Sequence, residues 1–214
     1  VPLLRATTTD WLSLAVADDS SGTIVLAGTN RVFGVADAFA GIAPLALNCG
    51  AVTPAGELTA VGCPLGGTNA RCFFVTNRGG IAALQLNTAG LPLCRNVPSP
   101  VTKGLLDVFV GVDPTSQAYD VRIVGQGGVA LRATAPILSA TDPNFLAASA
   151  DYSSFIPQSA RVDLNRVSGN SIDDLWVAGR GGVLLRWQNT PAGTPFVASP
   201  SGTTADIISL SSFG

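Results

Sequence analysis

The sequence predicts an all-β fold, a small β-propeller of four or five four-stranded blades built from a repeat of about 48 residues. Two observations predict it. A hairpin pattern recurs four times at nearly constant spacing, and the strands are apolar on both faces.

Each recurring hairpin consists of an apolar run, a tight turn rich in Gly or Asn, and a second apolar run. The four copies are TIVLAGTNRVFGVA (23–36), CFFVTNRGGIAALQL (72–86), VRIVGQGGVALRA (121–133) and LWVAGRGGVLLRW (175–187). Their turns begin at Gly28, Asn77, Gly125 and Gly179, which are 49, 48 and 54 residues apart. So regular a period indicates a repeat architecture, whereas a β-sandwich would not require it.

Each hairpin is flanked by two further short strands. The strand before it starts near Trp11, Leu58, Leu105 or Val162, and a weaker strand follows within 44–49, 91–97, 145–150 or 196–199. Four strands per repeat define a propeller blade. Strands without polar alternation, such as LWVA and GVLLRW, suit a sheet covered on both sides. Residues 35–47 and 142–155 have some helical character, and we interpret them as blade-edge strands or single helical turns.

The chain is expected to form one domain over 1–214, with repeats at about 10–56, 57–103, 104–160 and 161–205 and a partial fifth strand at 206–214. Ring closure stays open at this point. Either the N-terminal VPLLRA pairs with the C-terminal DIISLSSFG in a composite fifth blade, or four blades close alone, or the chain is part of a larger ring.

The stretch DLWVAGRGGVLLRW, Asp174 to Trp187, resembles the blade motif of bacterial secreted β-propellers of the sialidase-like and photosystem-assembly-factor-like superfamily. The resemblance implies a fold and a bacterial, secreted setting. It does not extend to sialidase activity, because no repeat carries the Ser-x-Asp-x-Gly-x-x-Trp turn of an Asp-box.

The cysteines indicate an oxidising compartment. They stand at 49, 63, 72 and 94 without CxxC spacing, and the chain has no His, so disulfides fit better than zinc. Cys63 and Cys72 are the best candidate pair, across a hairpin, and Cys49 with Cys94 would join consecutive repeats. The chain also has no Met, which indicates that an N-terminal piece, most simply a signal peptide, has been removed. We therefore expect an extracytoplasmic protein: periplasmic, cell-surface or secreted.

The composition of the chain limits the classes of partner that it is expected to bind. The net charge is −2 and only 12% of residues are charged, which argues against nucleic-acid binding. No apolar stretch approaches the roughly 18 residues that a transmembrane helix needs. We expect a protein partner, with a membrane-bound assembly as one specific form, and neither a cofactor nor a metal.

The propeller arrangement places two sets of candidate binding residues on opposite ends of the molecule. The turns between second and third strands carry Arg31, Arg78, Gln126 and Arg180, which would suit an acidic partner or an anionic lipid surface. The loops between first and second strands carry Asp18, Asp19, Asp113, Asp120, Asp173 and Asp174, which would suit Ca²⁺ or a basic partner. The simpler alternative is that Arg and Asp are ordinary turn residues there.

No catalytic residue is assigned. The absence of His excludes Ser-His-Asp and Cys-His arrangements, and no GxxxxGK[ST], HExxH or GxSxG motif occurs. A noncatalytic binding or scaffold module is therefore the leading hypothesis. One alternative is a glycosidase or lyase that uses two carboxylates of a central depression, with Asp10, Asp107 and Asp163 as candidates. Another is a lectin, which would need exposed Trp among Trp11, Trp176 and Trp187.

Overall fold

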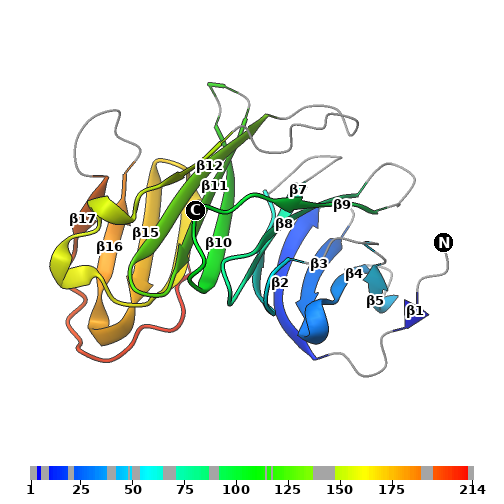
Figure 1. Ribbon diagram of the computed structural model, residues 1–214, viewed down its shortest axis with the longest axis horizontal. Coiled ribbons are helices and arrows are strands. Elements are labelled where there is room, and N and C mark those ends of the chain that lie inside the picture. Colours follow the sequence, from blue (N-terminus) through cyan, green and yellow to red (C-terminus); the bar gives the residue numbers. More distant parts are fainter. Residues whose placement is uncertain are drawn as a thin grey trace.

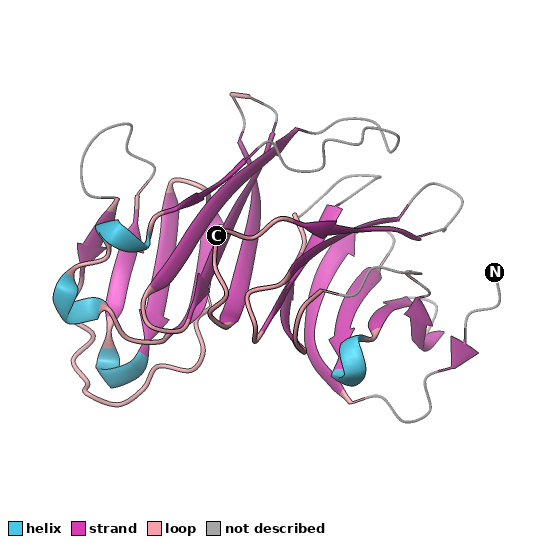
Figure 2. Ribbon diagram, in the orientation of Figure 1, coloured by secondary structure: helices cyan, strands magenta, loops and turns pink. Residues whose placement is uncertain are grey.

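The computed structural model shows four antiparallel sheets in a curved row, which are the blades of a β-propeller (Figure 1). It describes residues 4–5, 10–18, 22–37, 42–47, 49, 54–64, 71–86, 92–113, 115–116, 118–136, 148–188 and 195–211. The all-β class and the four-stranded blades are confirmed, with four blades formed. Over these residues the helical pieces are single 3-10 turns (Figure 2).

Blade 1 consists of β2 (Trp11–Asp18), β3 (Thr23–Gly28), β4 (Phe33–Asp37) and β5 (Ile42–Leu47), with the short β1 (Leu4–Arg5) added outside β5. Blade 2 consists of β6 (Leu58–Gly62), β7 (Arg71–Thr76), β8 (Ile81–Leu86) and β9 (Pro92–Val97).

Blade 3 consists of β10 (Leu105–Asp113), β11 (Ala118–Gly125), β12 (Val129–Pro136) and β13 (Ala148–Asp151). Blade 4 consists of β14 (Leu164–Ser171), β15 (Asp174–Gly179), β16 (Leu184–Trp187) and β17 (Phe196–Ala198). The 3-10 turns are η1 (Thr29–Arg31), η2 (Ser153–Phe155), η3 (Gln158–Ala160) and η4 (Arg180–Gly182). In each blade the strands follow one another in sequence order from the first strand outward.

The hairpin turns form because their residues tolerate a left-handed backbone. In blade 4 the turn residues Gly181 and Gly182 have φ of 63° and 73°, and in blade 1 Asn30 takes the same region at 56°. Gly and Asn adopt this region at the lowest steric cost.

The core lies between successive blades rather than within one of them. Phe33 of blade 1 meets Phe74 of blade 2 edge to face, with ring centroids 4.6 Å apart. Phe73, on the other face of β7, packs in the cluster that joins blades 2 and 3, and the fully buried Trp187 lies in the cluster that joins blades 3 and 4. Burial on both faces explains why the strand sequences lack polar alternation.

The first strands of successive blades are also joined by hydrogen bonds. The Val61 backbone N–H donates to Ser13 Oγ at 3.2 Å between blades 1 and 2. The Thr59 hydroxyl donates to the Leu105 carbonyl at 2.7 Å between blades 2 and 3. The Val167 N–H donates to Asp107 Oδ2 at 2.9 Å between blades 3 and 4. Each blade is thus fixed to the next along its innermost edge.

Both predicted disulfides form. Cys63 pairs with Cys72 at the start of β7, and Cys49 pairs with Cys94 of β9. The second bridge therefore joins the outer strands of blades 1 and 2. It adds a covalent link to the contact between these two blades.

In the part of the chain that the structure describes, the two termini do not build a composite fifth blade. Leu4 pairs with Ala46 and Arg5 with Leu45 of β5, so the N-terminal strand extends the outer edge of blade 1. Residues 206–211 are not assigned to a strand and lie against blade 4, where the Ile207 N–H donates to the Gly179 carbonyl at 3.0 Å. The N-terminal strand therefore packs on blade 1 and the C-terminal segment on blade 4.

Candidate functional site

The main candidate site is a hollow of about 470 Å³ formed by the first strands of all four blades. Each of these strands is the edge strand of its sheet, and residues from all four line the hollow. Its lining residues are Ala15 of β2, Val61, Gly62 and Cys63 in and just after β6, Val108 to Val112 of β10, and Gly169 to Asp173 in and just after β14. A site assembled from four repeats is a common use of a propeller's centre.

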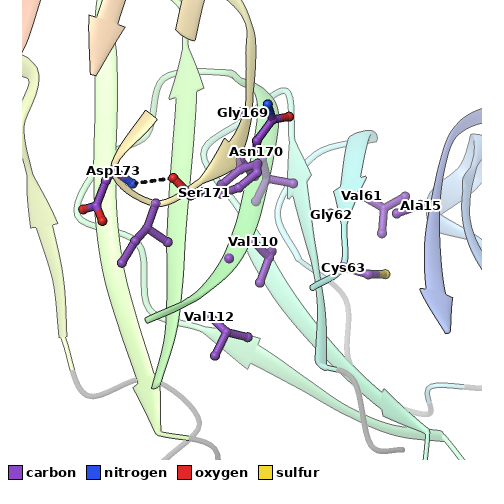
Figure 3. Close-up of a pocket in the computed structure, with 14 residues that line it drawn as sticks. Ala15, Val61, Gly62, Cys63, Val110, Val112, Gly169, Asn170, Ser171 and Asp173 are labelled. Carbon is purple, nitrogen blue, oxygen red and sulfur yellow. Dashed lines mark hydrogen bonds between the residues drawn. The ribbon is translucent and has the colours of Figure 1, made fainter. Parts of the chain in front are cut away.

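The hollow has an apolar floor and a polar edge on one side (Figure 3). Val110 and Val112 of β10 supply apolar surface, while Asn170, Ser171 and Asp173 supply polar groups from the end of β14. The Asp173 N–H donates to Ser171 Oγ at 3.3 Å, which holds this edge in a turn. Such a surface can bury apolar side chains of a ligand and orient it with a few polar contacts.

The carboxylate-enzyme alternative gains no support from this hollow. Among the described residues, Asp173 is the one carboxylate that lines it. A glycosidase needs two carboxyl groups about 5 to 10 Å apart across the substrate.

Two of the three acids named for that alternative accept hydrogen bonds from backbone amides. The third, Asp10, is exposed just before β2. Asp163 accepts a hydrogen bond from the Gly127 N–H at 2.9 Å. Asp107 accepts from Val167, and burial raises its pKa to about 6, offset in part by that hydrogen bond and by Arg166. The raised pKa of Asp107 therefore arises where this side chain is buried in the contact between blades 3 and 4.

The Asp set separates into different environments. Asp18 ends β2 and Asp19 lies outside the described residues. Asp113 ends β10, where the Thr115 N–H donates to its Oδ1 at 2.8 Å, and this bond is the main reason that its pKa is lowered. Asp174 begins β15 and forms an ion pair with Arg186 at 3.1 Å. Of this set, the hollow's described lining includes Asp173 alone.

The prediction that Asp120 lies in a loop between the first and second strands is wrong. It lies within β11, almost fully buried, and its carboxylate meets Arg122 Nε at 2.5 Å and Arg132 Nη2 at 2.7 Å. The Arg122 guanidinium in turn lies over the Trp187 ring of blade 4, 4.7 Å from its centroid. The group is a buried structural cluster between blades 3 and 4.

The Arg set lies at the hairpin-turn end, but this end carries both signs of charge. Arg31 and Arg78 line a second hollow of about 270 Å³, and Arg31 pairs with Glu57 at 3.9 Å. Arg180 lies 3.4 Å from Asp163 and 3.6 Å from Asp206. Acids at the starts of the first strands therefore offset two of these arginines. Binding of a partner by this set stays a prediction.

Gln126, the fourth member of this set, has a local role. Its side-chain Oε1 accepts a hydrogen bond from the Gly104 N–H at 3.2 Å. This contact ties the turn of blade 3 to the start of its own first strand.

The tryptophans do not form the exposed platform that a lectin would need. Trp187 is fully buried, and Trp11 and Trp176 are half-buried. The part of the chain that the structure describes contains no group of three or more acidic, His or Cys side chains placed to hold a metal ion. Within the same residues, no helix has the length and apolar character needed to cross a bilayer.

Sequence reasoning missed the lining of the main hollow. It selected charged loop residues, whereas half of the 14 lining residues are Val or Gly of the first strands, as in VFVGV at 108–112. The available signal was positional, because first strands of a propeller face its centre.

The fold defines the class of protein: a β-propeller chain, with four blades in a curved row over the described residues. Two solved structures share the fold over 93% of this chain with a TM-score of 0.60, namely "Structure of U3-55K" at 11% sequence identity and "Crystal structure of RRP9 WD40 repeats" at 10%. This chain spans 54% and 53% of those chains, about half their length. The likeness establishes the fold alone.

The resemblance noted in the sequence also has a counterpart among the solved structures. YCF48 from Cyanidioschyzon merolae, a photosystem assembly factor, matches with 9% identity, 95% coverage of this chain and 88% of its own, at a TM-score of 0.36. A TM-score at that level carries no functional argument. No known protein family and no curated protein matches the chain in sequence.

Proposed function

We propose that this protein is a noncatalytic binding or scaffold module that holds a segment of a protein partner in the hollow formed by its four first strands. The observation that carries the proposal is the composition of that hollow, with a floor of Val and Gly and a polar edge at Asn170, Ser171 and Asp173. Apolar side chains of a polypeptide would lie on the floor, and the edge would orient the segment.

The chemistry of the chain supports binding over catalysis. Without His, the residues able to transfer protons at neutral pH are chiefly carboxylates. The described acids with assigned contacts are used in turns, ion pairs and blade contacts. A binding surface does not require a carboxylate that is available for proton transfer, so these structural roles are compatible with binding.

We further propose that the protein works outside the cytoplasm, as a free module or as a subunit of a larger assembly, including a membrane-bound one. Two disulfides support an oxidising compartment, where such bonds persist. The low charge of the chain supports a role in which partners cover part of its surface.

The test is site-specific photocrosslinking in an extract of the native source. A photoreactive residue placed at Ser171, on the edge of the hollow, should form a discrete adduct with a polypeptide, and Val112→Arg in the same protein should abolish it. The matched control places the photoreactive residue at Ser159, which is exposed in η3 away from the hollow. Equal adducts at both positions, or none at Ser171, would contradict the proposal.

A further inference from the structure

The second hollow, of about 270 Å³, lies at the hairpin-turn end of blades 1 and 2. Its lining residues are Arg31, Gly56, Glu57, Asn77 and Arg78. Glu57 directly precedes β6, whereas Gly62 and Cys63 at the other end of that strand line the main hollow. The two hollows therefore lie at opposite ends of β6, and binding in the second does not rest on the proposed function.

Arg31 occupies a backbone position that the other three blades give to glycine. It stands three residues after the end of the second strand, as Gly79, Gly128 and Gly182 do in their blades. Those glycines have φ of 78°, 76° and 73°, and Arg31 has φ of 60°. An arginine adopts this left-handed region only at a steric cost. Strained residues of this kind are typical of ligand-binding sites.

The turns of blades 2 and 4 have no room for a side chain at the same position. A Cβ on Gly79 would clash with the Val101 carbonyl oxygen, and one on Gly182 would clash with the Thr203 carbonyl oxygen. In blade 1 the Arg31 side chain extends from this position, and 45% of it is exposed. Blade 1 therefore presents a guanidinium group where these two turns contact backbone.

Arg78 and Asn77 are held in place by the segment that leads into β6. Gly56 has φ of 86°, and a Cβ there would lie 2.8 Å from Arg78 Cβ, so the stem of this arginine packs directly on the Gly56 backbone. The Asn77 N–H donates to the Glu57 carbonyl at 3.0 Å, and Asn77 Oδ1 accepts from the Glu57 N–H at 2.9 Å. Because Oδ1 accepts this bond, Nδ2 is the part of the Asn77 side chain that can donate to a ligand.

The second hollow has an excess of positive charge. Two guanidinium groups line it, and Glu57 is the one carboxylate in its described lining, so the net charge is +1. Glu57 lies 3.9 Å from Arg31 Nε, which is too far for a hydrogen bond. Arg180 at the turn of blade 4 differs, because Asp163 and Asp206 both lie within 3.6 Å of it.

We infer that the second hollow binds one carboxylate group, held by the guanidinium groups of Arg31 and Arg78 and by the Asn77 amide. A planar guanidinium presents paired N–H groups that match the two oxygens of a carboxylate. One carboxylate balances the net charge of the lining, whereas a phosphate dianion would exceed it and be repelled by Glu57. The group can belong to a small acid or to the C-terminal end of a polypeptide, and both present the same chemistry.

The test is an NMR titration of the full chain, with its disulfides intact, with acetate at constant ionic strength, because salt screens exposed charges. The signals of the Asn77 side-chain amide and of Arg31 and Arg78 Nε–H should shift and saturate. Methyl phosphate should bind more weakly than acetate. A short peptide with a free C-terminal carboxylate, compared with its C-terminal amide, identifies the source: tighter binding than acetate indicates a chain end, and equal binding indicates a small acid.

Substitutions of the lining should change acetate binding in both directions. Arg31→Gln and Arg78→Gln should each weaken it by about threefold or more, since each removes one exposed ionic contact. Arg31→Lys keeps the charge and loses the planar fork, so it should also weaken binding. Glu57→Gln removes the carboxylate that competes for Arg31 and should tighten binding by about threefold.

Arg180→Gln is the matched control, because it removes the same charge from a turn where two acids already offset it. It should leave acetate binding unchanged. The substituted side chains are exposed, and circular dichroism with thermal unfolding confirms that each variant is folded. The inference would be overturned by the absence of a saturable shift with acetate, by methyl phosphate binding at least as tightly, or by equal losses in Arg78→Gln and Arg180→Gln.

Discussion

Asp120 and Arg122 form a buried ion pair on one face of β11, with Arg122 Nε 2.5 Å from Asp120 Oδ1. Asp120 also accepts from Arg132, and Arg122 stacks on Trp187 of the next blade. One carboxylate therefore compensates two guanidinium groups at the contact between blades 3 and 4.

Asp120→Asn should destabilise the protein strongly. It leaves two arginines without their counter-charge, and breaking one partner of a buried pair costs about 3 to 5 kcal/mol. The free energy of unfolding, measured with urea, should fall by that amount. Asp174→Asn is the control, because its pair with Arg186 is about half exposed and should cost less than about 1 kcal/mol. Equal effects of the two substitutions would contradict the role assigned to Asp120.

The two disulfides should differ in their contribution to stability. The Cys49–Cys94 bridge spans 45 residues and the Cys63–Cys72 bridge spans 9. In the chain-entropy account, losing the longer loop costs about 4 kcal/mol and losing the shorter one about 2.5 kcal/mol. Unfolding of the two paired Cys→Ser variants measures this directly. The opposite order would show that loop entropy does not dominate here.

Asp107 should make stability depend on pH between about 4 and 7. Burial raises its pKa from 3.8 to about 6, so the folded state binds this proton more tightly than the unfolded state does. The resulting stabilisation is fully present below pH 3.8 and is lost as the pH rises through about 6, an effect of about 2 to 3 kcal/mol. Asp107→Asn keeps an oxygen that accepts from Val167 and removes the titration. Its unfolding free energy, relative to wild type, should therefore rise over this range.

Asp113 provides the control of opposite sign. The Thr115 N–H is the main cause of its lowered pKa, so its contribution is present above pH 3.8 and is lost as the pH falls below it. Asp113→Asn should therefore weaken the protein at neutral pH relative to acid pH. If both variants shift stability in the same direction, the local environments described for these acids are incorrect.

The sequence predicted the blades because their signals are local. Turn residues such as Gly181 and apolar runs such as those of β7 and β15 are visible without knowledge of the fold. The disulfide partners followed once the repeat was found, because Cys49 and Cys94 stand at equivalent points of consecutive blades.

The contacts between blades could not be predicted in the same way. Whether Asp120 lies in a loop or in β11 depends on where the strand begins, and the burial of a charged residue depends on Arg122 and Arg132 reaching it. The course of the C-terminal segment depends likewise on contacts with Asn165 and Gly181, which are distant in sequence. Such placements are set by tertiary structure.

Successive blades are joined through hydrogen bonds of their first strands, and amide hydrogen exchange of two residues measures these bonds. Ser13→Ala should speed exchange of the Val61 amide by about tenfold and leave the Val167 amide unchanged, because Ser13 accepts from Val61 and Val167 donates to Asp107. Asp107→Ala should speed exchange of the Val167 amide and leave the Val61 amide unchanged. If neither amide responds to its own partner, or both respond to either substitution, the blades are not joined in this order.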